Sequence, residues 1–309
     1  MKRKHQPDCE CASVMSEEQY ALVFKTYRVG EFDEIYVPKK EAVHLTSLRE
    51  LKYLRDFKHN NIITISDTFN NGGCTHLVME YMDYNLESMI KNKDLSLSHI
   101  KFFMHQILLA LDYLQSKRVL HRDIKPRNIL VNKGGVLKLS GFWLARKRES
   151  TNHQFSPAAT TLWYRAPELL YGARHYNTTV DIWSFGCIVG EFCTKNPLFP
   201  GNSEIDQLEK IFTIRGSPNN QTWPNCRLYP GYLEPTYNAG VSLHLVLPNT
   251  PIDLISIADA ALQINPDSRP SAFQLMSFEF LRNVPVASEY SDPPIFQKDD
   301  TAYPSNSDY

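Results

Sequence analysis

Two short stretches that lie close together in the chain decide how this sequence is interpreted. The first is His121-Arg122-Asp123-Ile124-Lys125-Pro126-Arg127-Asn128, and the second is Lys138-Leu139-Ser140-Gly141-Phe142-Trp143-Leu144-Ala145-Arg146. Between them, Lys133-Gly134-Gly135 predicts a turn that joins two short strands, 129–132 and 136–139. The charged and amide side chains of the first stretch are therefore expected just before a hairpin, and the Gly-Phe-Trp segment just after it.

Working outward, the chain divides into a strand-rich part and a helix-rich part. Short β-prone runs occur at 21–24, 34–37, 62–65 and 76–79, with one helical stretch at about 45–56. From Leu86 onward, apolar residues recur at helical spacing, in a stripe made by Ile100, Phe103, Ile107, Leu111 and Leu114 and in a buried helix over 180–192. We therefore predict an α+β, bilobal fold. Its parts are a flexible N-terminus (1–10), a small β-rich lobe (11–82), a larger helical lobe (83–283) and a disordered tail (284–309).

Composition excludes several classes of protein. The 309 residues are 42% hydrophobic and 22% charged, enough for a large soluble core. A formal net charge of -1 provides no overall field for nucleic acid or anionic membrane, so neither is expected as a partner. The sequence has no apolar run of the ~18–20 residues that span a membrane and no secretory signal, which predicts an intracellular protein of the cytoplasm or nucleus. The six scattered cysteines are expected to be free thiols.

The first stretch matches the pattern His-Arg-Asp-x-Lys-x-x-Asn, and on it the chain resembles the eukaryotic protein-kinase family over about residues 10 to 283. The resemblance implies that Asp123 orients the proton of a substrate hydroxyl, that Lys125 neutralises the transferring phosphate and that Asn128 ligates magnesium. It extends to the segment 161–168, which ends Ala-Pro-Glu, and to the start of the helix at 181–187. It also implies a buried pair between Glu168 and Arg269 that holds the lobe together.

An insert at 197–208, followed by Gly-Ser-Pro at 216–218 and Trp-Pro at 223–224, is similar to the insert of the cyclin-dependent kinases. Within that group, the segment 168–176 looks most like the cell-cycle-related kinase branch, cyclin-dependent kinase 20, with the cyclin-activating kinase as next neighbour. That branch implies roles in cell-cycle control or at the cilium.

The same resemblance assigns the nucleotide site. Lys39 matches the strand lysine that holds phosphates, and Glu50 matches its helix partner, although the two are closer in sequence than is usual in the family. The other residues assigned to nucleotide binding are Val23, Val37, Glu80, Met82 and Asn85.

Three departures from the family pattern affect this site. The expected glycine-rich loop reads Ser-Glu-Glu-Gln-Tyr-Ala at 16–21, without the glycines whose backbone amides approach phosphate. Gly141 replaces the aspartate that binds magnesium, which leaves only Asn128 of the usual metal ligands. Trp143 replaces a glycine whose backbone angles tryptophan resists, and its indole must find a place to pack, whereas Phe142 is retained.

The expected regulatory residues are better preserved. Arg49, Arg122 and Arg146 match the arginines that bind the activation-loop phosphate of cyclin-dependent kinases, and Ser156, before Pro157, falls at the phosphorylated position. Arg165 matches the residue that favours proline after the target serine or threonine.

Two hypotheses remain open. One is a pseudokinase that acts in regulation by binding protein substrates or partners, among them a cyclin-like activator. The other is a weak proline-directed serine/threonine kinase that uses ATP and Mg²⁺.

Overall fold

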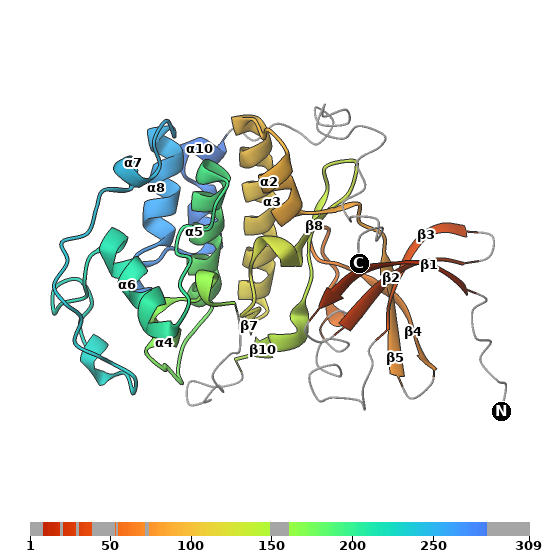
Figure 1. Cartoon of the computed structure of the whole chain (residues 1–309), viewed down its shortest axis with the longest axis horizontal. Coiled ribbons are helices and arrows are strands. Elements are labelled where there is room, and N and C mark those ends of the chain that lie inside the picture. Colours follow the sequence, from red (N-terminus) through yellow and green to blue (C-terminus); the bar gives the residue numbers. More distant parts are fainter. Residues whose placement is uncertain are drawn as a thin grey trace.

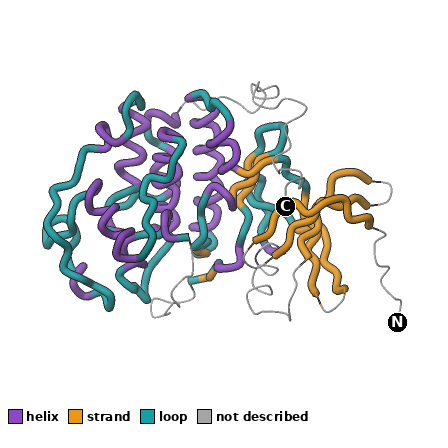
Figure 2. Tube along the Cα trace, in the orientation of Figure 1, coloured by secondary structure: helices purple, strands orange, loops and turns teal. Residues whose placement is uncertain are grey.

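The structure is a computed structural model. It describes the backbone of residues 9–18, 21–28, 31–38, 53, 55–71, 74–148 and 161–282, and the side chains of residues 53, 55–67, 79–148 and 161–282. A strand-rich part forms one end of the molecule and a helical part forms the other (Figures 1 and 2). This arrangement confirms the predicted α+β, bilobal fold.

The small lobe is built on one antiparallel sheet of five strands in the order β1-β2-β3-β5-β4. The strands are β1 (Cys9–Glu18), β2 (Ala21–Arg28), β3 (Glu31–Pro38), β4 (Ile65–Asn71) and β5 (Cys74–Glu80). Three of the predicted runs lie in β2, β3 and β5, and β4 pairs antiparallel with β5 up to Asn71 and Cys74. The predicted strand over 62–65 was wrong, because only Ile65 belongs to β4.

The segment before β4 instead bonds to the helical lobe. The Ile63 N–H donates to the carbonyl of Leu139 (3.0 Å), and the Leu139 N–H donates to the carbonyl of Asn61 (2.9 Å). The side-chain amide of Asn61 donates to Gln106 Oε1 (2.8 Å) and to the carbonyl of Leu137 (2.9 Å). Residues 61–63 therefore form a hydrogen-bonded seam along a strand of the large lobe. The side chains of Ile62 and Ile63 are buried in the hydrophobic core.

Long amphipathic and buried helices make the large lobe. The longer ones are α2 (Leu86–Asn92), α3 (Leu97–Ser116), α5 (Thr179–Thr194), α6 (Glu204–Arg215) and α8 (Ile252–Ala261). The shorter ones are α4 (Pro167–Leu170), α7 (Leu243–Val246), α9 (Ala272–Met276) and α10 (Glu279–Arg282). The predicted stripe lies on α3 and is buried throughout, and every residue of α5 from Val180 to Phe192 is buried.

Short strands and turns place the two decisive stretches side by side. β6 (Tyr84–Asn85), β8 (Ile129–Val131) and β9 (Leu137–Leu139) form one sheet, and β7 (Val119–Leu120) pairs with β10 (Arg146–Lys147). The single turns η1 (Pro126–Asn128), η2 (Phe142–Leu144) and η3 (Leu162–Tyr164) adjoin them. The hairpin predicted at 133–135 is confirmed, because β8 pairs antiparallel with β9.

A buried ion pair joins distant parts of the large lobe, as the sequence predicted. Arg269 donates from Nη1 to Glu168 Oε1 (2.6 Å) and from Nη2 to Glu168 Oε2 (2.7 Å), and both side chains are almost fully buried. Arg269 also donates to the carbonyls of Thr179, Gln263 and Ile264. Among the described residues, no helix combines the length and apolarity needed to cross a membrane.

Candidate functional site

The loop that carries Asp123 is held by a buried carboxylate at the start of α5. Asp181 accepts hydrogen bonds from the backbone N–H groups of His121 and Arg122, each at 2.8 Å. Burial raises the pKa of Asp181 to about 6, although these two bonds act in the opposite direction. Arg122 takes a left-handed backbone (φ 72°), which is uncommon for a residue other than glycine.

His121 connects the two stretches directly. The backbone N–H of Asp123 donates to Nδ1 of His121 (3.2 Å), so the ring proton lies on Nε2, which donates to the carbonyl of Ser140 (2.9 Å). Burial lowers the pKa of His121 to about 4, which keeps the ring neutral in the folded protein. The ring also contacts Phe142 edge-on, with centroids 4.5 Å apart. The catalytic-type loop and the Gly-Phe-Trp segment therefore form one packed unit.

The three residues predicted to be catalytic are brought together. Lys125 Nζ lies 3.1 Å from Asp123 Oδ2 and donates to the hydroxyl of Thr161 (3.1 Å). The Asn128 amide donates to Asp123 Oδ2 and to the Asp123 carbonyl, both at 2.7 Å. Thr161 belongs to a motif quoted from the sequence, but sequence reasoning gave it no role.

Gly141 lies directly against Asn128. Its backbone is left-handed (φ 78°, ψ 45°), and a Cβ atom added there would lie 2.8 Å from the Cγ and Nδ2 atoms of Asn128. The expected retention of Phe142 packing is confirmed, because this side chain is fully buried and its ring centroid lies 5.8 Å from that of Phe57.

Trp143 lies in η2 and is absent from the described residues with positive φ, so the glycine conformation is not needed there. Its side chain is half-buried.

Magnesium prefers a near-octahedral set of oxygen ligands, usually including one or two carboxylates. Within the described residues, no group of three His, Cys, Asp or Glu side chains is placed to hold a metal. The one carboxylate of this site, on Asp123, already faces an ammonium group and an amide N–H, and Gly141 supplies no side-chain oxygen. The described residues therefore do not fit a bound magnesium ion.

The predicted nucleotide residues are only partly described. Glu80 Oε1 lies 2.9 Å from Lys138 Nζ and accepts from the Thr64 N–H (3.0 Å). The Met82 side chain is 1% exposed and lies in the core, so only its backbone is available to a ligand. Asn85 caps α2, accepting from the Ser88 N–H at 2.8 Å. Val23 and Val37 lie in β2 and β3, whose side chains are outside the described part, as are Lys39 and Glu50.

The charges of two of the predicted phosphate-binding arginines, Arg122 and Arg146, act on Tyr176. The Arg122 guanidinium lies 5.7 Å from the centre of this ring and donates to the carbonyl of Leu144 (3.3 Å). Burial raises the pKa of Tyr176 to about 12, and the positive charges of Arg122 and Arg146 partly oppose this shift. Arg49 and Ser156 lie outside the described residues.

Arg165, predicted to favour a proline in the substrate, forms an ion pair with Glu204 (2.6 Å). Its side chain is 9% exposed, whereas that of Glu204 is 60% exposed.

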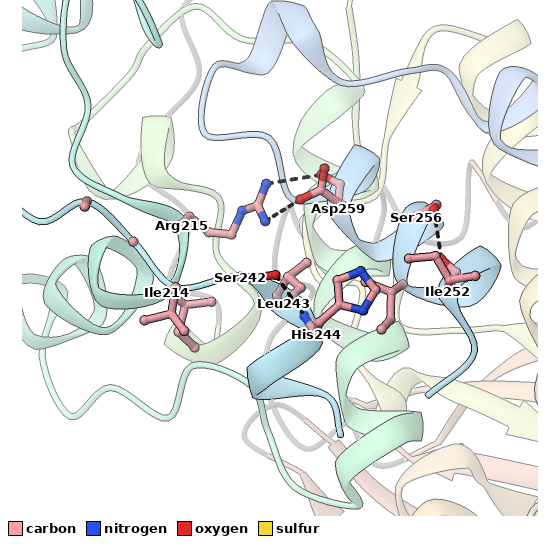
Figure 3. Close-up of a pocket in the computed structure, with 12 residues that line it drawn as sticks. Ile214, Arg215, Ser242, Leu243, His244, Ile252, Ser256 and Asp259 are labelled. Carbon is pink, nitrogen blue, oxygen red and sulfur yellow. Dashed lines mark hydrogen bonds and ion pairs between the residues drawn. The ribbon is translucent and has the colours of Figure 1, made fainter. Parts of the chain in front are cut away.

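A separate cavity of about 500 Å³ lies between the end of α6, the segment 239–244 and α8, far along the chain from the catalytic-type loop (Figure 3). Arg215 pairs with Asp259 (2.7 Å), and the Ser256 hydroxyl donates to the carbonyl of Ile252 (2.8 Å), so these lining groups bind one another. The sequence identified the insert but gave no signal for the cavity, because its walls come from three separate segments.

Comparison with known proteins agrees with this geometry. A family model described as "Protein kinase domain" matches residues 15–281. The match covers most of the chain, which therefore belongs to the protein kinase family.

Curated relatives narrow the group. Cyclin-dependent kinase 7 of Caenorhabditis elegans is 37% identical over 286 residues, which cover 91% of this chain and 85% of the relative. Cyclin-dependent kinase D-1 of Arabidopsis thaliana is 37% identical over 284 residues, covering 89% of this chain and 71% of the relative. Cyclin-dependent kinase 7 of Xenopus laevis is also 37% identical, over 88% of this chain and 80% of the relative. Within the kinase family, the chain belongs to the cyclin-dependent kinases.

Proposed function

We propose that this protein is a catalytically impaired cyclin-dependent kinase, a pseudokinase that acts in regulation by binding protein substrates or partners. The observation that carries the proposal is the contact between Gly141 and Asn128. Where a metal-binding carboxylate would project, the chain has only a glycine Cα, and the neighbouring amide donates to Asp123. The missing loop glycines point in the same direction, since they remove close backbone contacts to phosphate.

A weak proline-directed serine/threonine kinase that uses ATP and Mg²⁺ is the second candidate. It is favoured by the contacts of Lys125, which forms an ion pair with Asp123 and donates a hydrogen bond to Thr161. Removing one positioned electrostatic group commonly lowers a rate by ~10²–10³, so the loss at Gly141 alone does not exclude turnover. The combined loss of the loop glycines and the metal ligand favours the pseudokinase.

The experiment that separates these candidates is a thermal shift with ATP, with and without Mg²⁺ or Mn²⁺, followed by a peptide phosphorylation assay. We expect no metal-dependent shift and no turnover above that of the Asp123→Ala variant. Metal-dependent stabilisation together with turnover that Asp123→Ala abolishes would overturn the pseudokinase and establish the weak kinase. Asp123→Ala is an informative control because its side chain lies at the edge of the core, 10% exposed.

Regulation by phosphorylation forms part of the proposal. The charges of Arg122 and Arg146 both act on Tyr176. On the sequence resemblance, these two arginines and Arg49 would bind a phosphate on Ser156. Mass-spectrometric mapping of the protein from its own cells is expected to find phosphoserine at 156, and a uniformly unmodified Ser156 would contradict it. A cyclin-like partner, the cell-cycle-related kinase branch and its cell-cycle or ciliary setting are proposed on the sequence resemblance alone.

A further inference from the structure

The cavity between α6, the segment 239–244 and α8 is lined by polar groups that bind one another and by aliphatic groups that bind nothing (Figure 3). Arg215 donates to the carbonyl of Leu262 (2.8 Å) and pairs with Asp259, and the Ser256 hydroxyl donates to the carbonyl of Ile252. The aliphatic lining consists of Ile214, Val241, Leu243, Ile252 and Ile255. Because these polar groups are already paired, the cavity favours an apolar ligand over a charged one.

The aliphatic side chains at the rim of this cavity are open to solvent. Ile252 is 61% exposed and Val241 is 40% exposed, and Leu245, close to Val241 in the chain, is 76% exposed. The wall that carries Val241 is close-packed, because the Val241 N–H donates to the carbonyl of Ile214 (2.9 Å) and a Cβ atom at Gly240 would lie 2.6 Å from the Gly216 nitrogen. The cavity is therefore formed before any ligand binds, and an apolar segment that covers its rim gains free energy.

The chain continues beyond the described residues from a helix that adjoins this cavity. α10 ends at Arg282 and packs against α8, one wall of the cavity (Figure 1). The sequence Pro-Pro-Ile-Phe at 293–296 begins eleven residues after Arg282. A linker of that length spans about 38 Å when extended and about 17–20 Å on average when flexible. The ten residues of α8 are about 15 Å long, so the segment can reach any point along this helix and around it.

We propose that the segment 293–296 of this same chain docks in the cavity, with Ile295 and Phe296 against the aliphatic side chains of α8 and of residues 239–244. Its two successive prolines pre-set an extended backbone, so little conformational entropy is lost on docking. The other apolar run, Val-Pro-Val-Ala at 284–287, begins too close to Arg282 to pass around α8 and has no large side chain. The inference is independent of the proposed function, because the cavity is built from elements other than the Asp123 loop.

The first test is photo-crosslinking within the full chain. One variant carries p-benzoylphenylalanine in place of Phe296, and a matched variant carries it in place of Tyr303. After irradiation, mass spectrometry should find the probe at 296 joined, within one chain, to peptides that contain 239–244 or 252–259. The probe at 303 should label these peptides markedly less.

Two substitutions then separate docking from chance contact. Ile252→Asp puts a carboxylate on the exposed rim and should lower the yield from the probe at 296 by about three- to tenfold, because apolar contact area is lost. Leu228→Asp makes a similar change at a side chain that is 80% exposed and does not line the cavity, and it should leave the yield unchanged. Thermal denaturation of each variant checks that it is folded.

Hydrogen exchange provides a second readout without a probe. The double variant Ile295→Asp, Phe296→Asp should exchange the amides of 239–244 and of the first turn of α8 about threefold faster than wild type, whereas Tyr303→Asp should not. All three substitutions lie outside residues 15–281, which match the kinase domain, so they should not prevent folding.

The outcomes distinguish this inference from the proposed function. Cross-links between two copies, cross-links to other parts of the chain, equal labelling from 296 and 303, or exchange unchanged by the double variant would each overturn the docked segment. Metal-dependent binding of ATP with Asp123-dependent phosphorylation would overturn the pseudokinase and leave the docked segment unaffected.

Discussion

Glu168 and Arg269 in the helical lobe, and Asp123 and Lys125 in the candidate site, are both acid–base pairs, but their surroundings differ. The first pair is bidentate, with side chains 1% and 0% exposed, and Arg269 is further engaged by three carbonyl groups. The second pair makes a single contact of 3.1 Å, with side chains 10% (Asp123) and 20% (Lys125) exposed. The buried Glu168–Arg269 pair therefore holds parts of the helical lobe together, whereas the charged groups of Asp123 and Lys125 remain partly accessible to solvent.

The difference between the buried pair and the accessible pair is tested most strongly at Arg269. We expect Arg269→Ala to lower the free energy of unfolding by about 3–5 kcal/mol, because it leaves the Glu168 carboxylate buried without its cation. Urea denaturation followed by circular dichroism measures the loss. Arg282→Ala removes an exposed pair with Glu279 and should change stability by less than about 0.5 kcal/mol. Similar losses in the two variants would show that burial does not make the Glu168–Arg269 pair more stabilising than an exposed pair.

A second test concerns pH and the neutral ring of His121. Its folded pKa of about 4 lies below the ordinary 6.5, so the unfolded chain takes up a proton first and stability falls as pH drops from 6.5 to 4. Relative to His121→Gln, the wild type should lose about 3 kcal/mol over that window. Asp181 has a raised pKa of about 6 and contributes the opposite slope in both proteins, so it cancels in the difference.

Thermal denaturation of the wild type and His121→Gln in matched buffers at several pH values measures this difference. Asp123 and Lys125 are the other charged groups that act on the His121 ring. A difference in stability that stays constant from pH 7 to pH 4 would mean that His121 is not held neutral by burial.

A third test restores the missing carboxylate. Gly141→Asp should lower stability by about 1–3 kcal/mol without metal, because the residue is left-handed and its Cβ displaces Asn128 from Asp123. Millimolar Mg²⁺ or Mn²⁺ should recover part of the loss in Gly141→Asp but not in the matched variant Gly141→Asn. Differential scanning fluorimetry with and without metal measures both effects. Equal responses of the two variants would show that the site lacks more than this one carboxylate.

The smallest expected effect is at Asn85, which the sequence assigned to nucleotide binding. Because its side chain caps α2, Asn85→Ala should cost about 1 kcal/mol in stability, whereas Asn85→Asp should be nearly neutral. Chemical denaturation of the two variants makes the comparison. A stability of Asn85→Ala equal to that of the wild type would exclude the capping role.

Much of the fold could be predicted because local patterns agreed with it. The stripe on α3 and the apolar run of α5 have helical periods, and the Gly-Gly turn at 134–135 marks a hairpin. The strand predicted over 62–65 failed because this β-prone run pairs with Leu139, more than seventy residues away, rather than with the sheet of the small lobe. Such long-range hydrogen bonds leave no local signal.

The candidate site was predicted in composition but not in geometry. The sequence motif identified Asp123, Lys125 and Asn128 as parts of one site. It did not reveal the hydrogen bond that the Asn128 side-chain amide donates to the Asp123 carboxylate. The family pattern has a glycine at the position of Trp143, but it does not show whether this chain needs a left-handed residue there, and the structure shows that it does not.

The hydrogen-bonded seam at residues 61–63 also bears on where the molecule divides. By sequence, the two lobes meet near Met82, but Asn61 and Ile63 complete the hydrogen bonding of Gln106, Leu137 and Leu139 in the helical lobe. A fragment beginning at residue 83 would leave the Leu139 amide and carbonyl on an open strand edge. The smallest piece of this chain able to fold alone should therefore begin before Asn61, well inside the part that sequence assigns to the small lobe.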